Sequence, residues 1–540
     1  MAASTTTGKI SDSIDSEVGG SLILPENAGL QRKLNARHLQ MIALGGNIGT
    51  GLFIGSGAAL SRGGPLSLML AFLLIGITLF IMMQCLTEMA VLFPVSGSFT
   101  RYATRFVDPG LGFAMGWQYW MCGVSVFAAE ATAANILIGY WTQDVPVAVW
   151  ISLFIVINLI IHCFPVRTFG EVEFVVSTLK VVSVLGVIVV TWVIMAGGGS
   201  DGRMHGGEYW VDPGALANGF QGLASVFVTA AFACGGTEML GIVAGETKHP
   251  RYNFPRAVRT LMWRILIFYI TSLLFITFVV PSTHPSLLSP TRNAAASPFV
   301  IAIQEAGISV LPDLLNAIVL ICVCSVGSVS IYISSRVLVA LSEDGMAPRI
   351  FTRTDRSGRP RHALIFSGII SSGISYLNVS STGATVFGWF TSLSGMAFFL
   401  AWMTIIFCNF RFRKAMAAQG KEGWFKEPFA YTATFHPWLP AMAFTAVAFM
   451  AGCQFYVSLY PVGGVGRPDA KVFFGGFIGV PIFLVMWAAW KVVNGQWGFV
   501  PLGEVDLVMG RREGDTEERE LLEKYQELSR WRKALTYVHF

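Results

Sequence analysis

Long apolar runs separated by short polar segments recur along nearly the whole chain. Each run has about the length of a helix that crosses a bilayer core, which takes about 20 residues. We place twelve spans, at residues 39–61, 66–92, 110–140, 146–164, 172–197, 217–243, 260–281, 312–341, 362–379, 383–408, 437–460 and 470–491. The pattern predicts an all-α polytopic membrane protein, with twelve transmembrane helices in a domain at 38–493 between polar tails at 1–37 and 494–540.

Basic residues are distributed unevenly among the loops between these spans. If the N-terminus lies inside, the inner loops carry most of the loop Lys and Arg, counting Arg264 among them, whereas the outer loops carry Arg62, Arg203, Arg292 and Arg467. The positive-inside rule then places both termini in the cytoplasm. The net charge of +5 is explained by this asymmetry, so we expect no nucleic-acid partner.

The composition, 54% hydrophobic and 13% charged, suits a chain whose main surroundings are the lipid bilayer. All eight cysteines fall inside predicted spans, so no extracellular disulfide framework is expected. The chain contains no HExxH or paired CxxC motif, and its one GxSxG match, at 198–202, follows a predicted membrane span and not the strand that a nucleophile elbow needs. We therefore expect a protein that is not an enzyme and that has no cofactor and no metal site.

Two spans are interrupted by glycines, the first in "GGNIGTGLFIGSG" (45–57) and the sixth in "FACGGTEMLGIVAGE" (232–246). An interior glycine costs about 1 kcal/mol relative to alanine, and an opened backbone in hydrocarbon leaves polar groups unpaired. Two broken spans five apart are typical of transporters built from inverted five-helix repeats. The ends of half-helices can bind a carboxylate and an ammonium group, so a zwitterion fits this pair of breaks. Close helix packing is the alternative explanation for either set of glycines.

Three ionisable residues lie deep inside predicted spans, where a charge is costly: Glu130, Lys180 and Glu238. Burial can shift their pKa values, so each is a candidate proton carrier. The alternatives are structural. Lys180 could bond to unwound carbonyls, Glu130 could belong to a polar network between helices, and Glu238 could cap backbone groups beside the sixth-span break.

Five stretches carry a family likeness: "RHLQMIALGGNIGTGLFIGSG", "TEMAVLFPVSGSFTRYATRFVDPGLGFAMGWQYW", "GEVEFVVSTLKV", "FACGGTEMLGIVAGETKHPRYNFPRAV" and "LSEDGMAPRIFTRTDRSGRPR". In order and spacing they resemble the motifs of the fungal (yeast-type) amino-acid permeases of the amino acid-polyamine-organocation superfamily. The likeness covers about residues 30 to 495. It implies a LeuT-like core of ten helices in a 5+5 inverted repeat, with helices 1 and 6 broken and two extra helices. It also implies a proton-coupled importer of the plasma membrane.

The resemblance also assigns roles to residues. The substrate carboxylate would be bound by Gly49, Thr50 and Gly51, with Ile48 beside them. The ammonium would be received by the carbonyls of Phe232, Ala233 and Gly235, with the Phe232 ring as an outer gate. For proton coupling, Lys180 matches the lysine that replaces a sodium ion in proton-coupled relatives, Glu238 matches a glutamate linked to the gate, and Glu130 matches the third-span glutamate.

Side-chain selectivity must come from other residues of the lining. The candidates are Thr132, Cys234, Thr237, Ser325, Ser328, Phe390, Ser392 and Ser394. This set contains no arginine, so neutral or a broad range of amino acids are the expected substrates. The function expected is amino acid:proton symport, with cytoplasmic regulators as candidate partners at the tails. An amino-acid sensor of the same fold and an amino-acid exchanger stay open as alternatives.

Overall fold

The computed structural model describes residues 41, 48–200, 202–242, 249–288, 297–355, 358–380, 383–427, 430–464, 468–512 and 516–529. All regular secondary structure in this part of the chain is helical. The α-helices are α2 (Ser56–Leu92), α3 (Phe99–Tyr102), α4 (Pro109–Ile138), α5 (Val147–His162), α6 (Val166–Val193), α7 (Gly219–Cys234), α8 (Met239–Ile242), α9 (Pro250–Arg264), α10 (Ser272–Val279), α11 (Pro285–Leu288), α12 (Pro298–Glu305), α13 (Leu311–Glu343), α14 (Arg361–Ser375), α15 (Leu377–Ser380), α16 (Gly383–Ala418), α17 (Trp438–Leu459), α18 (Ala470–Phe477), α19 (Gly479–Asn494) and α20 (Thr516–Glu527).

Within the described ranges, nine helical stretches are long and apolar enough to cross a membrane. A tenth is formed if α18 and α19, which are bent by 67° against each other, make one span. Two features explain why this number is lower than the twelve expected spans. The helix from Gly51 to Leu92 is continuous by hydrogen bonding although Gly64, with φ 78°, is not helical, and α5 has only 16 residues. The count of twelve stays a prediction.

Local sequence explains how α4 begins. Asp108 precedes the helix in an extended conformation and its carboxylate accepts a hydrogen bond from the Gly110 amide (3.0 Å), while Pro109 occupies the first turn. Both are preferred residues at a helix N-terminus. Asp108 also accepts a hydrogen bond from Trp487 (2.8 Å) and pairs with Lys491 (2.8 Å). The same carboxylate therefore caps α4 and attaches α19 to it.

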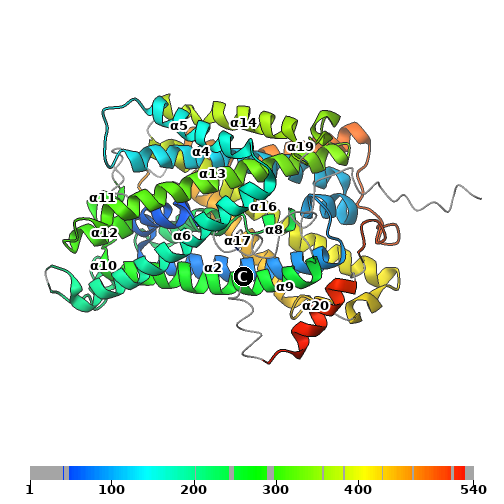
Figure 1. Ribbon diagram of the computed structural model, residues 1–540, viewed down its shortest axis with the longest axis horizontal. Coiled ribbons are helices and arrows are strands. Elements are labelled where there is room, and N and C mark those ends of the chain that lie inside the picture. The colour runs from blue at the N-terminus through cyan, green and yellow to red at the C-terminus, as the bar shows by residue number, and fades with distance from the viewer. Residues whose placement is uncertain are drawn as a thin grey trace, which may run out of the picture.

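The helices α4 and α13 form the centre of the bundle and pack along each other. The long helices α2, α4, α6 and α13 run along the long axis of the molecule (Figure 1). The helix α16 packs against both α4 and α7, and α2 packs against α7. The two segments predicted to be broken, 48–55 and 232–242, are therefore enclosed by neighbouring helices at the centre of the bundle.

The C-termini of α2, α13 and α16 and the N-terminus of α9 meet at one end of the bundle, which we call the basic end. Arg413 of α16 pairs with the buried Glu88 of α2 (2.5 Å). Arg101 of α3 pairs with Glu343 of α13 (2.5 Å).

Several arginines predicted to lie in an inner loop belong to α9 instead. Arg264, its last residue, is fully buried, and Arg251 and Arg256 of the same helix are buried as well. An arginine next to an apolar run has the appearance of a loop residue in the sequence.

The chain that follows α19 packs against the basic end. Val505 and Leu507 are buried, and carbonyls of this segment accept hydrogen bonds from Gln419 and Arg105. The helix α20 lies beside α9 (Figure 1), with Tyr525 in ring contact with Tyr252. We call residues 498–512 the C-terminal strap.

Candidate binding site at the helix breaks

The sixth apolar segment is helical at both ends and not in between. The helix α7 ends at Cys234 and α8 begins at Met239. Gly236 has φ 80°, a left-handed conformation that glycine adopts without steric cost and that stops the helix. The carbonyl of Ala233 accepts a hydrogen bond from the Tyr269 hydroxyl (2.9 Å), and the carbonyl of Cys234 accepts one from Thr237 Oγ1 (3.0 Å). Side chains thus satisfy carbonyls that the helix leaves free.

The first apolar segment contributes the start of a helix. The amides of Leu52 and Phe53 donate to the carbonyl of Gly49 (3.2 Å each), and a π-helical turn follows at Gly51–Gly55. The first amides of a helix have no partner within it and favour an anion. Gly45, Gly46 and Asn47, which belong to the same predicted break, lie outside the described residues.

The two segments touch each other at Gly51. A Cβ atom added there would lie 2.4 Å from the Cα of Ala233 and 3.0 Å from its amide nitrogen. Because these are backbone atoms, no side-chain rotation could relieve the overlap. Only glycine allows the two segments to come this close.

A small cavity lies between the two segments, with about 50 Å³ of space for the centres of water molecules. It is lined by Gly49, Thr50, Gly51, Tyr119, Cys122, Gly123, Val126, Glu130, Phe232, Gly235, Gly236, Met239, Val326, Val329, Ser330, Ile333 and Phe398. About 10–15 Å³ on this measure holds one water. The cavity therefore has room for a few waters, or for a group of a few atoms such as a carboxylate with its neighbouring ammonium.

Glu130 supplies the carboxylate of this cavity. Its Oε1 accepts a hydrogen bond from Thr50 Oγ1 (2.7 Å), whereas its buried Oε2 has no hydrogen-bond partner among the described residues. A buried polar atom without a partner is unusual and costly in a folded protein. An ammonium group or a proton arriving in the cavity would satisfy it.

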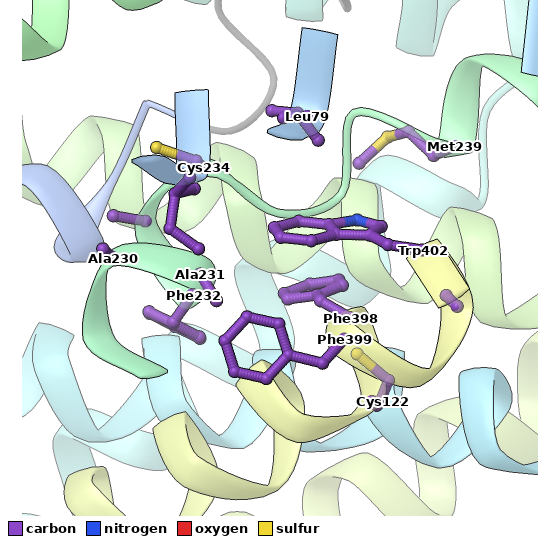
Figure 2. Packing of buried hydrophobic residues seen from close by; sticks show 14 of the residues in the cluster. Leu79, Cys122, Ala230, Ala231, Phe232, Cys234, Met239, Phe398, Phe399 and Trp402 are labelled. Atoms are coloured by element: carbon purple, nitrogen blue, oxygen red, sulfur yellow. The ribbon is translucent and has the colours of Figure 1, made fainter. Parts of the chain in front are cut away.

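Glu238 lies behind the break and not in the cavity lining. Its carboxylate accepts hydrogen bonds from Tyr119 (2.9 Å), Trp402 (3.1 Å) and the Gly236 amide (3.2 Å). Figure 2 shows Trp402 and Phe398 of α16 against the chain that joins Cys234 to Met239. Glu238 therefore ties the broken segment to α4 and α16.

Lys180 is fully buried in α6 and contacts an acidic partner that the sequence reasoning missed. Its Nζ donates to Ser325 Oγ (2.9 Å) and lies 3.6 Å from Glu173 Oε1, and Ser325 in turn donates to Glu173 Oε2 (2.6 Å). Ser177 donates to the same carboxylate (3.0 Å). Residues 173, 177 and 180 follow each other at helical spacings of four and three. That spacing could have pointed to Glu173.

Phe232 lies between the small cavity and a wider one. Its ring stands edge-on to Phe387 (6.1 Å between ring centres), which lines the wider cavity. Gly55, Arg62, Ser392 and Gln454 also line this second space, at the end of the bundle away from the basic end. The predicted selectivity residue Ser392 thus faces the wider cavity.

The structure brings only part of the predicted site together. Gly49, Thr50, Gly51, Phe232, Gly235 and Glu130 line the small cavity, and Ala233 is in contact with Gly51. Thr237 bonds to the buried Arg264 (2.9 Å) and Ser325 to Lys180, so neither lines the cavity. Ile48 is buried outside the lining, and so are Thr132, Cys234, Ser328, Phe390 and Ser394.

The helix α13 provides one wall of the cavity, but not through Ser325 and Ser328, which the sequence analysis chose on it. The lining residues Val326, Val329, Ser330 and Ile333 lie on one face of that helix. Their spacing of three and four residues is the signal of a common face. Tyr119, Cys122 and Phe398 also line the cavity, and nothing in the local sequence distinguishes these three from core residues.

A bundle of apolar helices with a small cavity at the meeting point of two helix ends defines the class of the molecule as a multi-pass membrane protein. The profile of the family described as amino acid permease matches residues 38–498, more than half of the chain. The chain belongs to the amino acid permease family. This membership supports amino-acid transport as its function.

Curated relatives agree with this assignment. The chain is 40% identical over 504 residues to the amino-acid permease GAP5 of Candida albicans, covering 93% of this chain and 80% of that protein. It is 40% identical over 511 residues to the general amino-acid permease GAP1 of Saccharomyces cerevisiae (93% and 83%). It is also 40% identical over 504 residues to the S-adenosylmethionine permease GAP4 of Candida albicans (92% and 81%). A solved structure of the nucleobase-cation-symport-1 transporter Mhp1 aligns with a TM-score of 0.47 at 15% identity, over 93% of this chain and 100% of that one.

Proposed function

We propose that this permease is a proton-coupled importer of L-amino acids at the plasma membrane, with both termini in the cytoplasm. In this proposal twelve transmembrane helices form a 5+5 inverted repeat and two extra helices. The observation that carries the proposal is the small cavity between the ends of two helices, where Glu130 Oε2 has no hydrogen-bond partner in the described part of the chain. A site of this kind suits a small zwitterion.

Each of the two helix ends would bind one charged group of the zwitterion. The substrate carboxylate binds at the helix start at Gly49–Gly51, where amides and the helix dipole favour negative charge. The ammonium binds near the end of α7, at the carbonyls of Phe232 and Gly235. The carbonyls of Ala233 and Cys234 already accept hydrogen bonds from side chains. Glu130 Oε2 is a further acceptor for that ammonium.

Proton coupling is assigned to the buried ion pair of Lys180 and Glu173. Each charge lowers the cost of burying the other, so removal of either charge by proton transfer destabilises the arrangement. Ser325 bonds to both groups and connects the pair to α13, the helix that forms one wall of the cavity. A change in the protonation of the pair therefore reaches the substrate site through α13. The alternative, that Lys180 only holds the helices together, predicts loss of folding and not loss of coupling.

The arrangement of cavities supports alternating access. The Phe232 ring separates the small cavity from the wider one at the far end, as an outer gate would. At the basic end, the pairs Arg101–Glu343 and Arg413–Glu88 hold the elements together. These contacts would have to open for release on that side.

The lining favours neutral substrates. Val326, Val329 and Ile333 make one wall apolar, and no arginine or lysine lies among the lining residues. An apolar wall discriminates weakly between apolar side chains of similar size, by a factor of about 10–200 for one methylene group. Broad selectivity among neutral amino acids follows.

The test is uptake of a panel of labelled amino acids by cells that lack their own permeases, at acidic and neutral external pH and with and without an uncoupler. Uphill uptake of neutral amino acids that collapses with the uncoupler supports the proposal. Uptake that ignores the uncoupler but rises with internal amino acid would mean an exchanger. Binding without uptake would mean a sensor.

A further inference from the structure

A third cavity lies near the basic end, between α5 and α14, and has no part in the site described above. It offers about 560 Å³ of space for the centres of water molecules, against about 50 Å³ in the small cavity. Its walls come from Leu159, His162 and Cys163 at the end of α5, from Ile331 of α13, and from one side of α14. We call it the α5–α14 groove.

Two guanidinium groups stand at one end of the groove. Arg359 and Arg361 both donate to the carboxylate of Asp355, at 2.8 and 2.9 Å. One carboxylate thus serves two positive charges, which leaves a net positive charge at the mouth. The side chain of Arg361 is 64% exposed, so its remaining N–H groups are accessible from outside.

The rest of the groove is apolar and open toward the surroundings of the bundle. Ile365 and Ile369 of α14 are 59% and 65% exposed, and Leu159 faces them from α5. The lining continues along α14 from Arg361 to Ser372, which is about 16 Å at the rise of an α-helix. The groove is therefore amphiphilic, with cationic groups at one end and a long apolar channel leading away from them.

We propose that the α5–α14 groove binds an anionic glycerophospholipid of the cytoplasmic leaflet. The phosphate of the headgroup pairs with Arg361, and one acyl chain lies along Ile365, Ile369 and Ser372. Charge complementarity selects this occupant, because the cytoplasmic leaflet is rich in anionic lipids and basic pockets between helices on that side recognise their headgroups. The choice of leaflet rests on the proposed orientation, but the binding itself does not depend on transport.

The test uses the purified full-length protein in detergent. Bound lipid is counted by native mass spectrometry after addition of phosphatidylserine or phosphatidylcholine in mixed micelles, and the melting temperature is followed in parallel. Wild-type protein should retain phosphatidylserine in preference to phosphatidylcholine. The soluble headgroup, glycerophosphoserine, should not reproduce the effect, because it has no chain to fill the groove.

Three variants separate the parts of the proposal. Arg361→Gln should lower phosphatidylserine retention about fivefold, the factor expected for one basic group at a membrane surface. Ser372→Leu, which adds volume inside the groove, should lower retention of both lipids. Arg349→Gln, an exposed arginine of the same end outside the groove, is the matched control and should change nothing.

Equal retention of the two lipids by wild-type protein would overturn the proposal, as would an Arg361→Gln variant that binds like Arg349→Gln. An equal effect of glycerophosphoserine would also overturn it, because the groove would then be a site for a free anion only. None of these results bears on uptake, so the proposed transport function is tested separately.

Discussion

Gly51 and Gly235, one at each helix break, have different neighbours, and this difference predicts different effects when each is replaced by alanine. A Cβ at Gly51 would meet backbone atoms of Ala233, whereas a Cβ at Gly235 would meet the ring of Phe398 at 2.2 Å. A side chain can move or be made smaller, but a backbone atom cannot. We expect Gly51→Ala and Gly235→Ala both to abolish uptake. Only the second should be rescued in part by a smaller partner, Phe398→Leu.

The measurement is uptake of a neutral amino acid, normalised to the amount of protein at the cell surface. The double variant Gly51→Ala with Ala233→Gly is the control, and it should stay inactive because the Cα atom of residue 233 is retained. Full activity of the single variant Gly51→Ala would show that the two segments do not approach each other as described.

Glu173 carries the second prediction. Its carboxylate is 3.6 Å from Lys180 Nζ and shares Ser325 with it, so Glu173→Gln removes the negative charge beside a buried lysine. We expect accumulation against a gradient to fall at least about tenfold, the effect of 1.4 kcal/mol on an equilibrium. Counterflow of labelled against unlabelled amino acid, which needs no net proton movement, should persist.

Glu171→Gln, the same change two residues earlier on a half-buried side of α6, is the control and should accumulate substrate normally. A parallel loss of counterflow, accumulation and surface protein in Glu173→Gln would assign Glu173 a purely structural role. Breaking a buried pair destabilises a fold by roughly 3–5 kcal/mol, so this outcome would be visible as poor expression.

At the residue scale, sequence predicted part of the site. Glycines and charged residues can be recognised as candidate site residues because they are costly in a membrane helix. Gly49, Gly51 and Glu130 do line the cavity. Glu173 did not stand out because it lies near the end of a predicted span, where a carboxylate is ordinary. Val326 and Ile333 did not stand out because an apolar residue in an apolar helix has the same appearance in a core and in a binding site.

At the scale of elements, the C-terminal strap makes a prediction about pH. Burial opposes ionisation of Asp506, but the amides of Val508 and Met509, which donate to Oδ1 at 2.8 and 2.9 Å, outweigh it together with nearby Arg105. The pKa of Asp506 is therefore held below its ordinary value of 3.8. A carboxyl pKa lowered by the folded strap stabilises its fold above that ordinary pKa, and this contribution is lost as the pH falls through the lowered value.

Hydrogen exchange of the strap, corrected for the intrinsic rate, measures this docking. Protection should be constant from about pH 7 to pH 5 and should decrease below about pH 4. Asp506→Asn should weaken protection already at neutral pH, whereas Glu504→Gln, an exposed neighbour, should not. Identical protection of Asp506→Asn and wild type at every pH would contradict the role of this carboxylate.

The elements themselves could be predicted well from apolar length, and their junctions less well. The runs at 110–140 and 312–341 correspond closely to α4 and α13. The strap was not predicted as part of the folded domain. Its attachment depends on single contacts such as Gln419 to the Val505 carbonyl and the Arg512 amide to the Leu92 carbonyl, and contacts with backbone atoms leave no periodic pattern in a sequence.

At the scale of the whole molecule, we propose that the parts form one route for the substrate. A wide cavity at one end leads to Phe232, the small cavity lies beyond it, and ion pairs hold the basic end. The buried pair of Lys180 and Glu173 contacts α13 at Ser325, and α13 also lines the small cavity. In our proposal, a proton moved at this pair drives an amino acid through the site between the helix breaks.

The most direct measurement uses the purified protein in sealed vesicles with an imposed pH gradient and no other source of energy. The wild type should accumulate a neutral amino acid above its external concentration, and accumulation should collapse when an uncoupler removes the gradient. Lys180→Met should bind and exchange the amino acid but not accumulate it. Accumulation by Lys180→Met equal to that of the wild type, or wild-type transport that ignores the gradient, would contradict the account.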